Sequence, residues 1–111
     1  MKIINICIII FCALFSSTVY SGSADYAVIN KVDFMEPGII VVYTDGLRTG
    51  APACATQPNR FVVDGTTPSG KVLLNGLVLT YSLKKSVRFV GNNTCSVYGN
   101  TETITYFQTN N

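Results

Sequence analysis

The sequence predicts a small, mainly β domain with one α-helix (β+α), in the order strand, strand, strand, helix, strand, strand. Short segments rich in β-branched and aromatic residues, separated by Gly, Pro and Asn, indicate the strands. One longer segment, 67–85, carries helix signals. The chain has 111 residues, 48% of them hydrophobic and 13% charged, which fits one folded domain and argues against disorder.

Composition and turn signals mark the first three strands. Residues 25–34 alternate in part and end at a Glu-Pro-Gly turn over 36–38. Residues 39–44 (IIVVYT) are the densest β-branched run and predict the second strand. A long connection over 47–58, with one Gly and two Pro, leads to a third strand over 60–64 (RFVVD).

Two structures compete for the next segment. Thr67 and Pro68 are typical of a helix start, and the apolar positions 73, 74, 77, 78 and 81 fall on one helical face. Lys84-Lys85 stands where cations favour a helix end. Against this, Asn75-Gly76 is a strong hairpin signal, and Gly within a helix costs about 1 kcal/mol relative to Ala. Local signals leave both structures open.

Two further strands are predicted over 86–90 and 101–109. In the last strand, alternation places Glu102, Ile104 and Tyr106 on one face and residues 103, 105 and 107 on the other. Five strands with one helix after the third is the order of a five-stranded oligonucleotide/oligosaccharide-binding (OB-fold) barrel.

The first 24 residues have the three zones of a secretory signal peptide: Lys2, the ten apolar residues 6–15, and a small, polar stretch. The apolar run is about half the length of a spanning helix, so we expect no stable membrane span. Small residues at 22 and 24 predict cleavage before Asp25, with cuts after Ser21 or Ser23 also open. The domains are therefore a signal peptide (1–24) and one domain (25–111), secreted or periplasmic.

Cysteine usage fits an oxidising compartment. Cys7 and Cys12 lie in the predicted signal peptide, and Cys54 and Cys95 remain as a pair. We expect a disulfide between them, within one chain or between two. Within one chain, it would close some 40 residues and restrict the unfolded state by roughly 3–4 kcal/mol.

Composition also argues against several function classes. The chain has no His, which removes Ser-His-Asp and Cys-His catalysis and His-ligated metal sites. Its net charge of +2 is small for a protein that binds nucleic acid by charge. Asp45 and Asp64 each precede a Gly, where a turn explains them. We therefore expect no enzyme, no catalytic or metal-binding residue, no cofactor and no nucleic-acid partner.

Aromatic and basic residues supply the binding candidates. Seven aromatic residues could form a stacking platform for sugars or bases: Tyr43, Phe61, Tyr81, Phe89, Tyr98, Tyr106 and Phe107. Of these, Phe61 and Phe89 are expected in the core, whereas Tyr98, in a turn-rich segment, is the candidate for an exposed ligand-binding aromatic. A basic patch for an anionic partner could be built from five residues: Arg48, Arg60, Lys84, Lys85 and Arg88.

The segment from RFVVD through the Thr67-Pro68 helix start, Lys84-Lys85 and Cys95 to the closing strand with Glu102 resembles small secreted bacterial proteins. These are related to the B subunits of subtilase cytotoxin and pertussis-like toxins. The likeness covers about residues 39–108. It implies a helix rather than an Asn-Gly hairpin. It also implies a ring of five copies, in which the helices line a pore and edge strands of neighbouring copies pair. The implied ligands are cell-surface glycans, often sialylated, and the implied partner is a secreted toxin A subunit.

The chain departs from that pattern in two respects. It has no Trp, whereas cholera-type sites stack a sugar on one, and it is shorter, with one disulfide. No sugar-contacting residue is therefore transferred. We expect a non-enzymatic, secreted, glycan-binding homo-pentamer; the alternative is a stand-alone periplasmic or secreted OB-fold protein with a structural or other binding role.

Overall fold

The structure, a computed structural model, describes residues 21–110. Lys2, the apolar run and both leader cysteines of the predicted signal peptide lie outside these residues. The elements are β1 (Ser23–Met35), β2 (Ile39–Thr44), β3 (Arg48–Thr49), β4 (Arg60–Asp64), α2 (Pro68–Ser82), β5 (Ser86–Gly91) and β6 (Glu102–Thr109). The predicted mainly β class with one helix is confirmed, and the segment with Asn75-Gly76 is helical.

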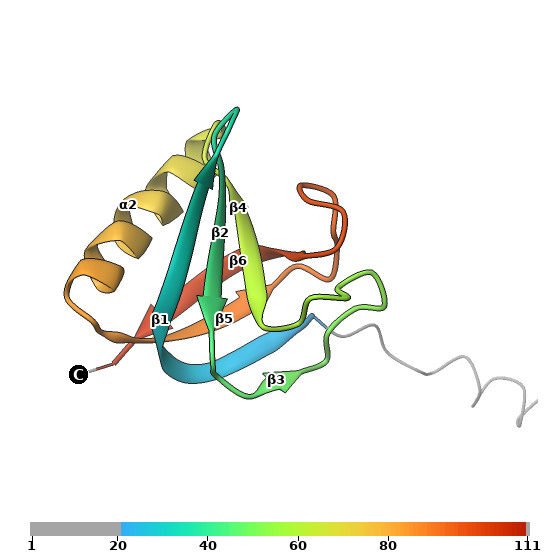
Figure 1. The fold of residues 1–111 in the computed structure, drawn as a ribbon, viewed down its shortest axis with the longest axis horizontal. Helices are drawn as coiled ribbons and strands as arrows, with labels where there is room; N and C mark the ends of the chain where they lie inside the picture. The colour runs from blue at the N-terminus through green and yellow to red at the C-terminus, as the bar shows by residue number, and fades with distance from the viewer. Residues whose placement is uncertain (1–20, 111) are drawn as a thin grey trace, which may run out of the picture.

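The strands form one sheet that closes into a ring. Its order is β2-β4-β6-β5-β1-β3, and β1 also pairs with β2, so five strands surround the core (Figure 1). All pairs are antiparallel except β4 with β6, which run parallel and share two register positions, Phe61 with Glu102 and Val62 with Thr103. The helix between β4 and β5 lets the chain re-enter the sheet on the far side of β6.

The sheet closes into a ring because the long strand β1 bends. Its first part pairs with β5 and its second part with β2, and the register shifts between residues 24 and 27 and again between 29 and 31. Such bulges bend a strand and increase its twist. The structure also contains a short strand that the sequence did not predict, β3, whose two residues pair with Ser23 and Ala24.

Aromatic side chains fill the ring, as expected for Phe61 and Phe89. Both are fully buried, with ring centroids 5.2 Å apart, and Phe107 lies 6.3 Å beyond Phe89. The other buried members of the core are Ala24, Ile29, Ile40, Val42, Val63, Leu77, Val87 and Ile104.

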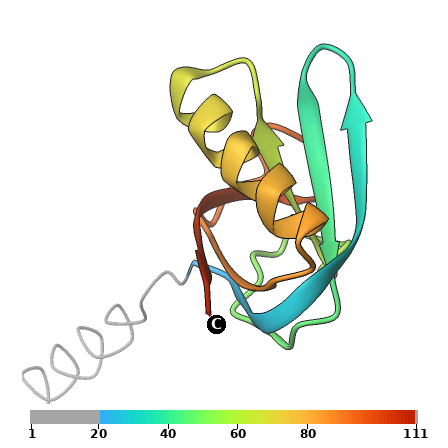
Figure 2. The same cartoon turned by 90° about the vertical axis from the view of Figure 1, so that its left-hand side faces the viewer.

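Helix α2 lies across one opening of the ring (Figure 2). Leu77 is buried there, and Leu73 and Leu74 pack against the core. A Cβ atom at Gly76 would come within 2.8 Å of Phe107 Cζ, so this glycine allows the helix to approach the barrel closely. Close packing therefore explains the residue that suggested a hairpin.

The helix ends earlier than predicted. It stops at Ser82, and Lys84 takes a left-handed conformation with φ 54°. The Lys84 N–H donates to the carbonyl of Tyr81, and the Lys85 N–H donates to that of Thr80, which is the Schellman pattern. Lys84-Lys85 thus closes the helix through backbone bonds just beyond its last turn.

The predicted alternation of β6 is wrong after Ile104. Glu102 and Ile104 share one buried face, in keeping with the alternation, but Tyr106 is 44% exposed and Phe107 packs on the core. The register shifts here, because Val90 pairs with Tyr106 whereas Gly91 pairs with Ile104. Thr105 is therefore an extra residue on β6, and it exchanges the two faces of the strand.

The helix start gives a test of local stability. Thr67 Oγ1 accepts a hydrogen bond from the Gly70 N–H at 2.9 Å. We expect Thr67→Ala to lower the free energy of unfolding by about 1 kcal/mol, because it leaves an amide of the first turn without this acceptor. Thr67→Ser retains the hydroxyl and should lose less. Urea unfolding of both variants checks this; equal losses would contradict the capping role.

Candidate functional site

A half-buried arginine organises the outer face of β2 and β4. Arg60 is the first residue of β4, and it is the direct cross-strand partner of Tyr43 on β2. Its Nη1 donates to Tyr43 Oη at 3.1 Å, its Nε to Thr101 Oγ1 at 2.8 Å, and its Nη2 to Asn100 Oδ1 at 2.7 Å. These contacts fix the guanidinium between the sheet and the connection that precedes β6.

Two tyrosine rings flank this guanidinium. The Arg60 Cζ atom lies 5.8 Å from the ring centroid of Tyr43 and 5.6 Å from that of Tyr98, both within cation–π range. Tyr98 is 37% exposed, which fits its prediction as an exposed aromatic. We call Tyr43, Arg60, Tyr98, Asn100 and Thr101 the Arg60 cluster.

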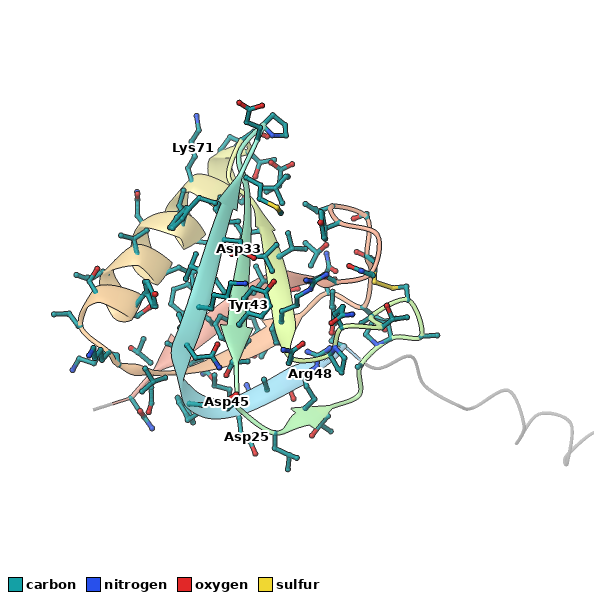
Figure 3. All side chains as sticks on the ribbon, in the orientation of Figure 1. Asp25, Asp33, Tyr43, Asp45, Arg48 and Lys71 are labelled. Carbon is teal, nitrogen blue, oxygen red and sulfur yellow. A yellow bond between two sulfur atoms is a disulfide. The ribbon has the colours of Figure 1, made fainter. Side chains whose placement is uncertain are left out.

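Among the described residues, no acid balances the charge of Arg60. Its three hydrogen-bond acceptors are neutral oxygens, and within residues 21–110 no carboxylate forms a salt bridge with it. The nearest acidic contact is indirect: Tyr43 Oη donates to Asp33 Oδ2 at 2.9 Å, and Lys31 Nζ lies 3.6 Å from the other oxygen of Asp33. Asp33 lies diagonally across from Tyr43, because the direct partner of Tyr43 on β1 is Lys31 (Figure 3).

The chemistry of the Arg60 cluster suits a polar ligand with an anionic group. A guanidinium carries five N–H donors, and three of them are used here, so two remain. Tyrosine rings stack on flat, apolar faces such as those of sugars, and the amide of Asn100 offers further hydrogen bonds. The cluster therefore offers a positive charge, hydrogen-bond groups and aromatic rings to a ligand.

The predicted disulfide supports this region. Cys54 and Cys95 are bonded within one chain, with Cα atoms 6.1 Å apart. The bond joins the connection after β3 to the one before β6, where the Gln57 N–H also donates to the carbonyl of Asn100 at 3.2 Å. In Figure 3 it links the two loops on the side away from the helix. Tyr98 and Asn100 thus lie on a loop anchored to a second loop.

The other predicted basic residues do not join Arg60 in one patch. Arg88 Nη1 donates to Gln108 on the neighbouring strand, and Lys84 and Lys85 follow the helix end. Arg48 is turned inward: its side chain is 11% exposed, and its Cζ lies 4.2 Å from the centroid of the buried Phe61 ring. The basic-patch hypothesis fails because the fold directs these side chains to different surroundings.

The partner of Arg48 is Glu102, which is completely buried. Arg48 Nη2 donates to Glu102 Oε1 at 2.7 Å, and the N–H groups of Gly22 and Asn93 each donate to Oε2 at 2.9 Å. A buried carboxylate needs such charged and polar partners. The carboxylate of Glu102 thus accepts three hydrogen bonds from within the domain, which gives this residue a structural role.

The remaining acids are dispersed. Asp64 caps the turn before α2: the Thr66 hydroxyl, and then its N–H, donate to this carboxylate and lower the pKa of Asp64. Within the described range, no three His, Cys, Asp or Glu side chains are grouped to hold a metal ion. Over the same residues, no helix has both the length and the apolar character required to cross a membrane.

Sequence reasoning singled out Tyr98 but did not place its partners beside it. Tyr43 was one of seven aromatic candidates for stacking, and Arg60 was part of a basic patch that does not form. The register that makes Lys31, Tyr43 and Arg60 one row across β1, β2 and β4 depends on a bulge in β1. The Thr101 and Asn100 contacts join residues about 40 positions apart, and no local pattern marks them.

Comparison with known proteins finds no match to a protein-family model, to a curated protein or to a solved structure.

The buried ion pair gives the second prediction. We expect Arg48→Met to lower the free energy of unfolding by about 3–5 kcal/mol, because it leaves the Glu102 carboxylate buried without its cation. Lys31→Met is the matched control, since it removes the cation of the exposed Lys31–Asp33 pair and should cost less than about 1 kcal/mol. Unfolding in guanidinium chloride measures the free energy of both variants. Losses of similar size would contradict the structural role of the buried Arg48–Glu102 pair.

Proposed function

We propose that the protein is a non-enzymatic, secreted binding subunit that binds carboxylate-bearing cell-surface glycans through the Arg60 cluster. The observation that carries this proposal is an arginine that has no acidic partner within residues 21–110 and is held between two tyrosines on the barrel surface. Arginine binds carboxylates with paired N–H donors, and sialylated glycans present a carboxylate beside a sugar ring. One cluster thus offers contacts for both parts of the ligand.

The position of the cluster supports an OB-fold barrel as its scaffold. The closed order of β1, β2, β4, β6 and β5, with α2 after the third barrel strand, is compatible with that fold. OB-fold barrels bind oligosaccharides and oligonucleotides on the face of the second and third strands and the loops beside it. Tyr43 lies on the second barrel strand, Arg60 on the third, and Tyr98 on the loop between the last two.

Apolar side chains on the helix support assembly into a ring like that of the toxin B subunits. Val72 is 72% exposed and Leu79 is 59% exposed, and Phe34 at the end of β1 is 63% exposed. Within the described residues, β1 beyond Ile29 has one paired edge, which faces β2, and β6 beyond Thr103 has one paired edge, which faces β5. The second edge of each described segment is open for pairing with a neighbouring subunit. We propose that the helices face the centre of a homo-pentamer, that these edges pair with neighbours, and that a secreted toxin A subunit docks on the ring.

The glycan prediction is tested with the secreted protein on immobilised sialylated glycans. We expect Arg60→Gln to weaken binding at least ten-fold, because one lost charge-assisted hydrogen bond corresponds to about 1.5–3 kcal/mol. Tyr98→Ala should also weaken binding, and Arg88→Gln is the control because it removes an arginine that lies outside the cluster. Sialidase treatment of the glycans should abolish binding.

Two results would contradict the glycan proposal. Undiminished binding by Arg60→Gln would show that the Arg60 cluster is not the glycan site. Equal binding to sialidase-treated glycans would show that the carboxylate of the glycan is not recognised. Circular dichroism of each variant verifies that the fold is intact before binding is compared.

The assembly prediction is tested by light scattering over a range of concentrations. We expect a mass of five protomers for the native protein and a shift to monomer for Leu79→Glu, because a charge on the helix face opposes its burial in a pore. Ala53→Glu adds the same charge on the exposed loop between β3 and β4, outside the helix and both proposed pairing edges, and should leave the mass unchanged. A native monomer at every concentration would overturn the ring and favour the stand-alone secreted or periplasmic OB-fold protein.

A further inference from the structure

Residues just before Asp25 belong to the folded domain. Ala24 is fully buried in the core, and Ser23 and Ala24 pair with β3 on one side and β5 on the other. A chain that begins at Asp25 would lose a core side chain and the start of β1. The residues that the predicted cleavage site removes are therefore residues on which the barrel depends.

Gly22 is held more tightly still. Its N–H donates to Glu102 Oε2 at 2.9 Å, and its carbonyl accepts from the Gly91 N–H at 2.7 Å. A Cβ atom at this position would collide with the Glu102 carboxylate and come within 2.9 Å of Arg48 Nη2. Position 22 therefore requires a glycine for a contact within the folded domain, which a discarded leader residue would not need.

The contact matters because Glu102 has no exposed surface. Its Oε1 is bound by Arg48, and its Oε2 depends on the N–H groups of Gly22 and Asn93. Loss of Gly22 would leave Oε2 with one donor, and an under-bonded buried carboxylate is costly. Ser21, the preceding residue, is small and exposed.

We propose that the leader is removed between Ser21 and Gly22, and that the new α-ammonium group of Gly22 pairs with Glu102. A signal peptidase hydrolyses the Ser21–Gly22 peptide bond: the hydroxyl of water joins the Ser21 carbonyl carbon, and the released Gly22 nitrogen takes its hydrogen. That amine, protonated from solvent, replaces an amide donor on Oε2 with a charged one. Arg48 holds Oε1, so the two cations bind different oxygens of Glu102.

This inference rests on the proposed secretion, and the first test separates the two. The full chain is expressed with its leader in a secreting host, and the exported protein is examined by intact mass and N-terminal sequencing. We expect a first residue of Gly22. A first residue of Ser23 or Asp25 would overturn the cleavage site and leave secretion supported, whereas an uncut chain retained in the cell would overturn both.

The ion pair is tested by the reactivity of the α-amine toward an acylating reagent. We expect the Gly22 amine of the secreted protein to react at least ten-fold more slowly in the folded state than in denaturant. The matched control is a chain that starts at Ser21, released from a cleavable tag, whose amine lies one residue outside the contact and should show little such protection. Equal folded-state reactivity of the two chains would overturn the ion pair.

Discussion

The buried carboxylate of Glu102 is the constraint on which one end of the barrel depends. Glu102 begins β6, and its partners come from the residue before β1, from β3 and from the loop after β5. An ion removed from water is tolerated only when such partners replace its hydration. Gly91 and Gly22 leave the space that the carboxylate occupies, since a Cβ atom at either position would collide with it. The charge therefore fixes the meeting point of strands that are distant in sequence.

The opposite opening is closed by apolar packing instead of charge. Leu77 enters the core from α2, while Gly76 allows the helix to lie against Phe107. Phe107 packs against Phe89, and Phe89 stacks on Phe61. The guanidinium of Arg48 lies over the Phe61 ring. One continuous row of aromatic contacts thus runs from the helix to the buried ion pair, so packing at one opening supports the geometry at the other.

Local sequence signals predicted what depends on neighbours in the chain. The strands, the Thr67-Pro68 helix start and the Cys54–Cys95 pair follow from such signals, and the structure contains each. Local sequence signals failed where the closure of the barrel determines the structure. The Thr105 bulge exchanges the faces of β6, and β3 forms because β1 offers it an edge for pairing. The residue types of the candidate site were predicted but not their grouping around Tyr98, because the guanidinium and the second ring arrive through strand register and contacts about 40 residues apart.

The two arginines of the barrel show how the same side chain acquires different roles. Arg48 pairs with a fully buried carboxylate, which neutralises its charge inside the domain. Arg60 is held by neutral oxygens of Tyr43, Asn100 and Thr101, which orient the guanidinium and leave its charge in place. Orientation by neutral groups is what a site for an anion requires, because an acidic partner would compete with the ligand. The fold therefore separates the charge that stabilises it from the charge that the proposed anion site would use.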